Sequence, residues 1–194
     1  EDLTDTKVDQ FSLAGFAELN ASLTDRLRGE VGLRTDYVRA DVTDLIAPVN
    51  SGEADDILFS PSASLAFLVK DGIELYASYG EGFHTNDARG YVIEVEPSTG
   101  TPVDWTPVFV KARGYELGAR YERDDLKLTL AGFYLELDSE LVFVGDVGTS
   151  EPSDGSERYG FEATAFWQAT DWLAIDGSYA YADAEFTIPG PDTY

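Results

Sequence analysis

The segment Tyr159-Gly160-Phe161-Glu162-Ala163-Thr164-Ala165-Phe166-Trp167-Gln168 alternates, with nearly every odd position apolar and most even positions polar or small. Because successive side chains of a β-strand point to opposite faces, the segment predicts a strand with one apolar and one polar face. The same period returns at residues 10–23, 30–34, 59–69, 73–80, 115–122, 126–131 and 173–180. No comparable stretch spaces its apolar residues as a helix would. The predicted fold class is therefore all-β.

The composition narrows the class of protein further. The 194 residues suffice for one sizeable domain, and 13 basic against 37 acidic side chains leave a formal charge of −24. Such a surface repels nucleic acid, which we exclude as a partner, and attracts cations and basic ligands. The chain has no cysteine, which excludes disulfides and thiolate metal sites. It has no apolar run long enough for a transmembrane helix, but a barrel strand needs only about 9–11 alternating residues.

The connections between the predicted strands alternate in length. Residues 24–27, 70–72, 123–125 and 169–171 are short, and the Asp71-Gly72 pair suits a hairpin turn because glycine accepts positive φ. Residues 43–57, 84–111 and 145–157 form long polar segments. Short turns at one end and long loops at the other predict part of an antiparallel up-and-down transmembrane β-barrel of about eight strands. The turns are expected in the periplasm and the loops outside the cell.

A soluble β-sandwich or lipocalin-like barrel also alternates, so other features must separate the classes. The strands are longer than is usual in soluble proteins. Aromatic residues gather near the strand ends, with Trp167 and Trp172 at one short turn and Tyr37, Tyr79 and Tyr134 toward the loops. Charged residues alternate on the presumed inner face, at Glu18, Glu30, Arg34, Glu74, Glu116, Arg120, Glu162 and Asp176. A polar lumen accommodates such charges, whereas a packed apolar core does not.

One segment points to a family. Residues 79–90, Tyr-Gly-Glu-Gly-Phe-His-Thr-Asn-Asp-Ala-Arg-Gly, closely resemble a strand-to-loop motif of the TonB-dependent outer-membrane receptors. Residues 60–67 before it are similar to a strand of that family that carries a Ser-Pro-Arg element, although Ser62 stands where a basic residue is common. Residues 112–121 and 159–162 resemble later strands of the same barrel. The resemblance spans about residues 8–188.

The resemblance implies energised uptake of a scarce nutrient such as a siderophore, cobalamin or a glycan, across the outer membrane of a Gram-negative cell. It implies TonB as a partner, acting through a plug, together with contacts to outer-membrane lipid and lipopolysaccharide. Such barrels have about 22 strands. We therefore expect residues 1–194 to be one partial barrel domain, without the N-terminal plug and the remaining strands. The alternatives are a small soluble or membrane barrel with a binding or structural role in the envelope, and a passive porin.

The sequence carries no G-x-S-x-G, H-E-x-x-H, P-loop or EF-hand pattern, so we predict no enzyme, no catalytic residue, no metal site and no cofactor. The predicted ligand-binding residues are His84, Asn86, Asp87, Arg89, Trp105 and Phe109. The first four lie where a strand reaches the outside, and they either shape a vestibule or brace the first turn of the loop. In the second case Arg89 is expected to pair with a carboxylate of the inner wall.

Two further features of the predicted loops are each compatible with two roles. Trp105, Pro107 and Phe109 either stack on an aromatic or sugar ligand or fold the loop over the mouth. Six acids crowd the first long loop, at Asp36, Asp41, Asp44, Glu53, Asp55 and Asp56. Their spacing matches no defined calcium or magnesium loop, and we expect a solvated outer segment or one joined to lipopolysaccharide phosphates by divalent ions.

Overall fold

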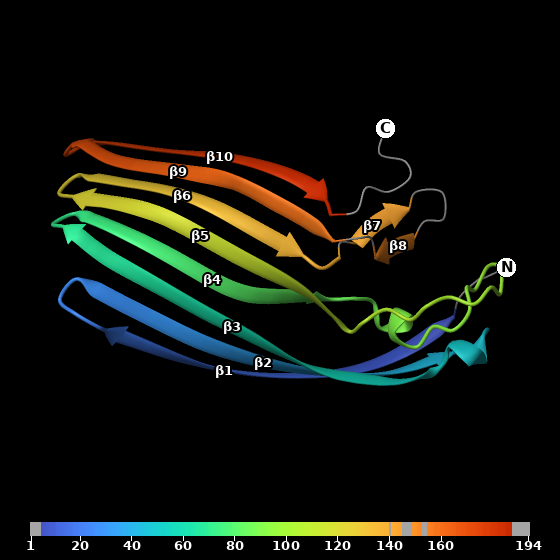
Figure 1. Cartoon of the computed structure of the whole chain (residues 1–194). Coiled ribbons are helices and arrows are strands. Elements are labelled where there is room, and N and C mark those ends of the chain that lie inside the picture. The colour runs from blue at the N-terminus through green and yellow to red at the C-terminus, as the bar shows by residue number, and fades with distance from the viewer. Residues whose placement is uncertain (1–4, 140, 145–148, 153–154, 188–194) are drawn as a thin grey trace.

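The computed structural model describes residues 5–139, 141–144, 149–152 and 155–187. Its main element is one curved antiparallel sheet in the order β1-β2-β3-β4-β5-β6-β9-β10 (Figure 1). The strands of this sheet are β1 Thr6–Ser22, β2 Leu27–Asp44, β3 Gly52–Lys70, β4 Ile73–Thr85, β5 Phe109–Arg123, β6 Leu126–Leu137, β9 Ser156–Thr170 and β10 Leu173–Phe186. A separate hairpin pairs β7, Leu141–Val144, with β8, Thr149–Pro152, and the 3₁₀ helices are η1, Pro48–Asn50, and η2, Ala88–Tyr91. The predicted all-β, up-and-down arrangement is confirmed.

The short turns lie together at one end of the sheet, and the long connections lie at the other (Figure 1). Gly72 closes the predicted Asp-Gly turn with φ of 79°, a conformation that suits glycine. A Cβ there would also lie 2.6 Å from the Glu122 carbonyl oxygen. Asp124 takes φ of 44° in the next turn along the sheet. The sequence therefore predicted these two turns correctly.

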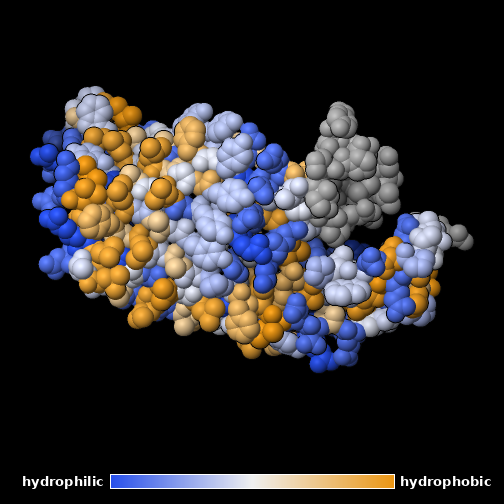
Figure 2. Space-filling model, viewed as in Figure 1, coloured by the Kyte–Doolittle hydropathy of each residue, from blue (hydrophilic) through white to orange (hydrophobic). Residues whose placement is uncertain are grey.

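The register gives the sheet two chemically different faces. Leu13, Leu75, Leu117 and Phe161 lie on one face, and their exposed fractions of 64%, 47%, 69% and 42% show that they do not meet in a dry interior. Figure 2 shows apolar side chains gathered over the turn-side half of the sheet, with more polar ones toward the loop end. An outward apolar face of this extent is what hydrocarbon requires of a barrel wall. We call it the apolar face.

A row of tyrosines crosses the apolar face toward its loop end. Tyr79, Tyr115, Tyr134 and Tyr159 are consecutive register partners on β4, β5, β6 and β9. The ring centroids of Tyr79 and Tyr115 are 5.1 Å apart, and those of Tyr115 and Tyr134 are 6.0 Å apart. Two residues farther along, toward the loops, Glu81, Arg113, Glu136 and Glu157 follow in the same register. The row marks a change from apolar to charged side chains, as at a membrane–water boundary.

The opposite, polar face carries the alternating charges predicted for the inner wall. Arg28 on β2 forms an ion pair with Glu74 on β4, reaching across β3, where the register partner of Arg28 is the small Ala66. Glu74 also accepts a hydrogen bond from Arg120 on β5 at 3.4 Å. The Arg120 guanidinium carbon lies 4.2 Å from the ring centroid of Tyr76. These contacts join β2, β4 and β5 on one face and pass over β3.

The long connections at the loop end do not begin and end where the sequence predicted. Residues 43–57 were predicted as one long loop, but β2 runs to Asp44 and β3 begins at Gly52, so only residues 45–51 connect them. The prediction was wrong because acidic residues such as Asp41 and Asp55 lie on exposed positions of paired strands. In the third long connection, which was predicted at 145–157, β7 and β8 form a hairpin and β9 already begins at Ser156.

The packed core also lies at the loop end. Residues of β2, β3, η2, the start of β5 and the position just before it pack there, namely Val38, Ala40, Val42, Leu58, Ala88, Tyr91, Val108 and Phe109. β3 pairs with β4 only from Ser62 onward, so the two strands separate beyond that point. The connection of residues 86–108 contributes to this core, which fixes it against the sheet.

Candidate functional site

The candidate site is the loop end, where residues 45–51 and 86–108 meet above the sheet. Residues 86–108 are folded by their own backbone: Thr106 N–H donates to the Gly90 carbonyl at 2.7 Å, and Val103 N–H donates to that of Glu94 at 3.0 Å. A bridge pairs Val95 with Pro102. The longest connection is thus a compact unit. We use the name platform for residues 86–108 and residues 45–51 taken together.

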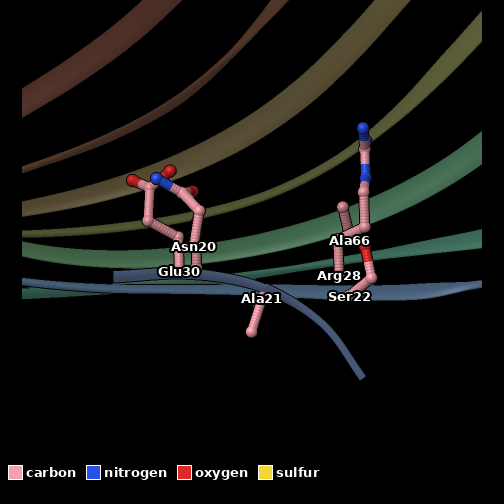
Figure 3. Close-up of a pocket in the computed structure, with 8 residues that line it drawn as sticks. Asn20, Ala21, Ser22, Arg28, Glu30 and Ala66 are labelled. Carbon is pink, nitrogen blue, oxygen red and sulfur yellow. The ribbon is translucent and has the colours of Figure 1, made fainter. Parts of the chain in front are cut away.

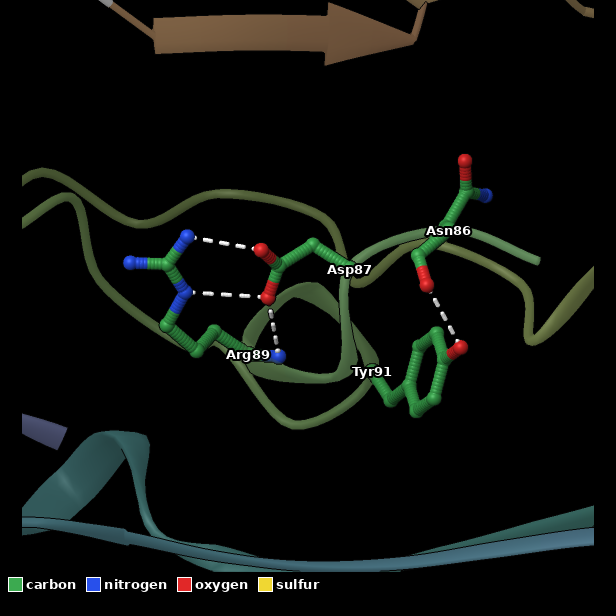
Figure 4. Close-up of polar contacts among 4 residues, drawn as sticks. All are labelled: Asn86, Asp87, Arg89 and Tyr91. Atoms are coloured by element: carbon green, nitrogen blue, oxygen red, sulfur yellow. Dashed lines mark hydrogen bonds and ion pairs between the residues drawn. The ribbon is translucent and has the colours of Figure 1, made fainter. Parts of the chain in front are cut away.

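Asp87 begins the platform and caps η2. Its carboxylate accepts the backbone N–H of Arg89 at 2.9 Å. The Arg89 guanidinium donates to the same carboxylate through Nε at 2.9 Å and through a terminal nitrogen at 2.6 Å (Figure 4). The expectation that Arg89 pairs with an inner-wall carboxylate was wrong, because Asp87 lies two residues away and offers both of its oxygens.

The Asp87–Arg89 pair shifts both pKa values in favour of the charged forms. The hydrogen bonds from Arg89 hold the pKa of Asp87 below its ordinary value, and Asp87 raises the pKa of Arg89. A carboxyl whose pKa is lowered on folding stabilises the fold above its unfolded pKa and loses that contribution as pH falls through the folded pKa. The cap therefore persists at neutral pH and is lost only in acid.

Asn86 and Tyr91 brace the platform from its buried side. The Tyr91 hydroxyl donates to the Asn86 carbonyl at 2.6 Å (Figure 4), and the Asn86 amide donates to the Pro107 carbonyl at 2.9 Å. Asn86 is 6% exposed and Tyr91 is 5% exposed. Burial raises the pKa of the Tyr91 hydroxyl, which keeps it protonated as a donor. The first turn of the loop is therefore braced by Asn86, one of the two roles considered for it.

The remaining predicted site residues differ in accessibility. Trp105 is 69% exposed on the platform, whereas Phe109 is 7% exposed and meets Phe83 edge-on with ring centroids 5.0 Å apart. His84 is half-buried on β4, and its Nε2 is buried without a hydrogen-bond partner. The platform thus brings Asp87, Arg89 and Trp105 to the exterior and keeps Asn86 and Phe109 inside.

Asn50, which the sequence did not single out, joins the two parts of the platform. Its Oδ1 accepts the backbone N–H groups of Glu94 and Val95, each at 3.0 Å, and its Nδ2 donates to the Val95 carbonyl at 2.9 Å. Asn50 is 5% exposed. The local Pro-Val-Asn-Ser sequence does not predict this role, because the hydrogen-bond partners of Asn50 lie 44 and 45 residues away.

A hollow lies on the polar face near the turns. It has a volume of ≈ 350 Å³ and is lined by residues of β1, β2 and β3 that include Asn20, Arg28 and Glu30. Figure 3 shows these three side chains projecting to the side toward which the sheet curves, while Ala21 points the opposite way. The polar face is therefore the concave one, as predicted for a lumen wall.

In residues 5–139, 141–144, 149–152 and 155–187, no helix is long and apolar enough to cross a membrane. In the same ranges, no group of three or more His, Cys, Asp or Glu residues is placed to hold a metal ion.

A concave polar face, a convex apolar face with a tyrosine boundary, and folded loops at one end define the wall of an outer-membrane β-barrel. Residues 2–194 match the family model described as TonB dependent receptor-like, beta-barrel. The chain belongs to the β-barrel family of the TonB-dependent receptors, which are transport receptors of the Gram-negative outer membrane.

Named relatives and solved structures agree with this family. The chain is 28% identical over 167 residues to the metal-pseudopaline receptor CntO of Pseudomonas aeruginosa, covering 84% of this chain and 23% of that protein. It is 27% identical over 184 residues to a pesticin receptor of Yersinia enterocolitica, covering 91% and 26%. The crystal structure of the ferric yersiniabactin uptake receptor FyuA of Yersinia pestis superposes with a TM-score of 0.74 at 23% identity, over 95% and 28% of the two chains. The chain thus spans about a quarter of the length of these relatives.

Proposed function

We propose that this chain is a wall section of a receptor that takes up a metal chelate at the cell surface. The family match over residues 2–194 carries the proposal, supported by relatives whose names refer to metal-pseudopaline and ferric yersiniabactin. In such a receptor a plug and further barrel strands complete the lumen, and TonB supplies energy through that plug. The concave polar face would then face the plug or water, and the platform would form part of the mouth.

The charge of the platform favours a neutral or cationic chelate. Its acids are Asp87, Glu94, Glu96 and Asp104, and its one cation, Arg89, is engaged by Asp87. The rest of the chain adds to this field, since the full sequence carries a formal charge of −24. A negative mouth lowers the local concentration of a multiply anionic ligand and raises that of a cation. Exposed Trp105 would supply an apolar or stacking contact beside these charges.

The apolar face provides the second set of proposed contacts. Lipid chains would cover the side chains between the turns and the tyrosine row, and the charged row beginning at Glu81 would meet the polar headgroup region of lipopolysaccharide. The acids on the exposed ends of β2 and β3 would be solvated there.

An uptake assay tests the proposal. Cells that produce the complete receptor would be given hydroxamate, catecholate and aminocarboxylate chelates of radioactive iron, nickel and copper, in strains with and without TonB. We expect accumulation of a neutral or cationic chelate only when receptor and TonB are both present. Uptake restricted to multiply anionic chelates would contradict the ligand class, and absence of TonB-dependent uptake for every chelate would contradict transport of metal chelates.

A further inference from the structure

Asn50 lies at the contact between two connections that are far apart in sequence. Residues 45–51 join β2 to β3, and residues 86–108 join β4 to β5. The Asn50 side chain meets the backbone of the second connection as a neighbouring strand would, accepting from Val95 N–H and donating to Val95 C=O. A third hydrogen bond, from Glu94 N–H, completes the contact.

The first connection is prepared to hold Asn50 in this position. The Asp44 carboxylate accepts the backbone N–H groups of Ile46 and Ala47 at 2.9 and 2.8 Å. The Ser51 hydroxyl accepts Asp44 N–H at 2.8 Å, and Asn50 N–H donates to the Ala47 carbonyl at 2.9 Å. These bonds fix the turn locally, so little conformational entropy remains to be lost when Asn50 binds its distant partners.

The second connection presents backbone groups that need a partner. Val95 already bridges Pro102 on its other side, and the buried Asn50 side chain is the partner of its N–H and C=O on this side. Removing one partner of such a contact costs more than the bond itself contributes wherever the group left behind is out of reach of water. Asn50 therefore holds the two connections together more firmly than an exposed polar contact would.

The two connections that Asn50 joins both carry exposed apolar side chains. Val49 precedes Asn50 and is 47% exposed, and Val103, whose N–H donates to the Glu94 carbonyl, is 37% exposed. Trp105 follows two residues later. Apolar side chains from both connections are thus carried by one unit.

We propose that Asn50 is the positioning residue that makes residues 45–51 and 86–108 move as a single rigid wall of the receptor mouth. The two connections do not open independently around a ligand; the ligand meets a preformed surface. The consequence for affinity rests on the proposed function, because it assumes that this mouth binds the chelate. Preorganisation of this kind raises affinity by removing the fraction of molecules in which the surface is not assembled.

Spin labels test the rigid unit directly: these 194 residues contain no cysteine, and any cysteine elsewhere in the complete receptor would first be replaced by serine. Leu45→Cys and Asp104→Cys would each carry a nitroxide in the complete receptor in detergent, since both positions are exposed. We expect a narrow distance distribution by double electron–electron resonance. Asn50→Ala should broaden it, whereas Asn50→Asp, which keeps the acceptor for Glu94 and Val95, should broaden it less. Asn20→Ala, which removes an exposed asparagine bonded only to Glu18, is the matched control.

The affinity measurement uses the chelate that is taken up best in the panel above. We expect Asn50→Ala to raise the KM of uptake about fivefold or more, with the maximal rate per receptor unchanged and Asn50→Asp intermediate. An unchanged distance distribution in Asn50→Ala would overturn the rigid unit. A broadened distribution with unchanged KM would overturn the positioning role. If no chelate is taken up by the wild type, the proposed function fails, and the label distances still decide whether Asn50 joins the two connections.

Discussion

Gly118 is a residue of the polar face that leaves no room for a larger side chain. The ring of Tyr76 on β4 lies across this glycine of β5, so that a Cβ at position 118 would overlap the ring. Tyr76 is 9% exposed and lies under the Arg120 guanidinium. Through Arg120 and Glu74 the tyrosine is linked to Arg28, two strands away. The absence of a side chain at Gly118 therefore makes room for the Tyr76 ring and for the polar contacts that link β2, β4 and β5.

We predict that Gly118→Ala destabilises the barrel by about 1–3 kcal/mol, the usual range for extra volume in a packed site. Tyr76 would have to leave its position, and Arg120 would lose the ring beneath it. Denaturant unfolding of the complete receptor, refolded in lipid vesicles, measures the change. Gly177→Ala on β10 is the control, because nothing lies within 4 Å of a Cβ built there. Equal stability of the two variants would show that the Tyr76 ring relocates freely.

Along each strand, adjacent side chains face different surroundings: one side faces lipid and the other faces the polar side of the sheet. Ala77 and Leu117 are register partners on the apolar face, and Ser78 and Glu116, one position along, are partners on the polar face. Leu117 is 69% exposed, which in water would be unfavourable and in hydrocarbon is not. The same pair of strands thus allows both faces to be tested at one depth.

Leu117→Lys should destabilise the barrel by about 1–3 kcal/mol, because a lysine on the lipid face costs about 2–4 kcal/mol at the midplane and less toward the boundary, and Leu117 lies two residues inside the tyrosine row. Ser78→Lys should change stability by less than about 1 kcal/mol, because its ammonium would face the polar side beside Glu116. Both free energies of unfolding would be measured in lipid vesicles. A larger cost for Ser78→Lys than for Leu117→Lys would reverse the assignment of the two faces.

For the whole molecule, all the short turns lie at one end and the platform lies at the other (Figure 1). The tyrosine row is nearer the platform, so the chain has a defined direction across the membrane. β1 and β10 form the two edges of the described sheet, and each presents one side without a neighbouring strand in that sheet. In the complete receptor further barrel strands are expected to pair with both edges, as closure in lipid requires.

This direction predicts which positions are reached from outside the cell. A maleimide attached to a large polyethylene glycol should label Asp104→Cys on intact cells. It should label Asp71→Cys, in a short turn, only after the outer membrane is permeabilised. These 194 residues contain no cysteine, and the receptor without an introduced cysteine is the control for any signal from elsewhere. Labelling of Asp71→Cys on intact cells would place the turns outside and contradict the orientation.

Much of the wall was predictable because its signal is local. Alternation with a period of two defines a strand and assigns each side chain to a face, whatever the partner strand is. The Asp71-Gly72 turn and the tyrosines near the loop ends follow from the same short-range reading. The loop boundaries were less accurate, since acids on β2 and β3 were interpreted as loop although those strands continue beyond the apolar zone.

The sequence by itself determined the class of fold, the two faces and the direction of the strands, because each depends on residues within a few positions of one another. Only the tertiary structure decided that Arg89 turns back to Asp87, that Asn86 and Phe109 are buried, and that Asn50 joins two connections. The ion pair of Arg28 with Glu74 spans 46 residues, and the bonds of Asn50 span 44 and 45. Contacts at such separations depend on how the sheet curves and where its loops pack, which no local pattern of side chains encodes.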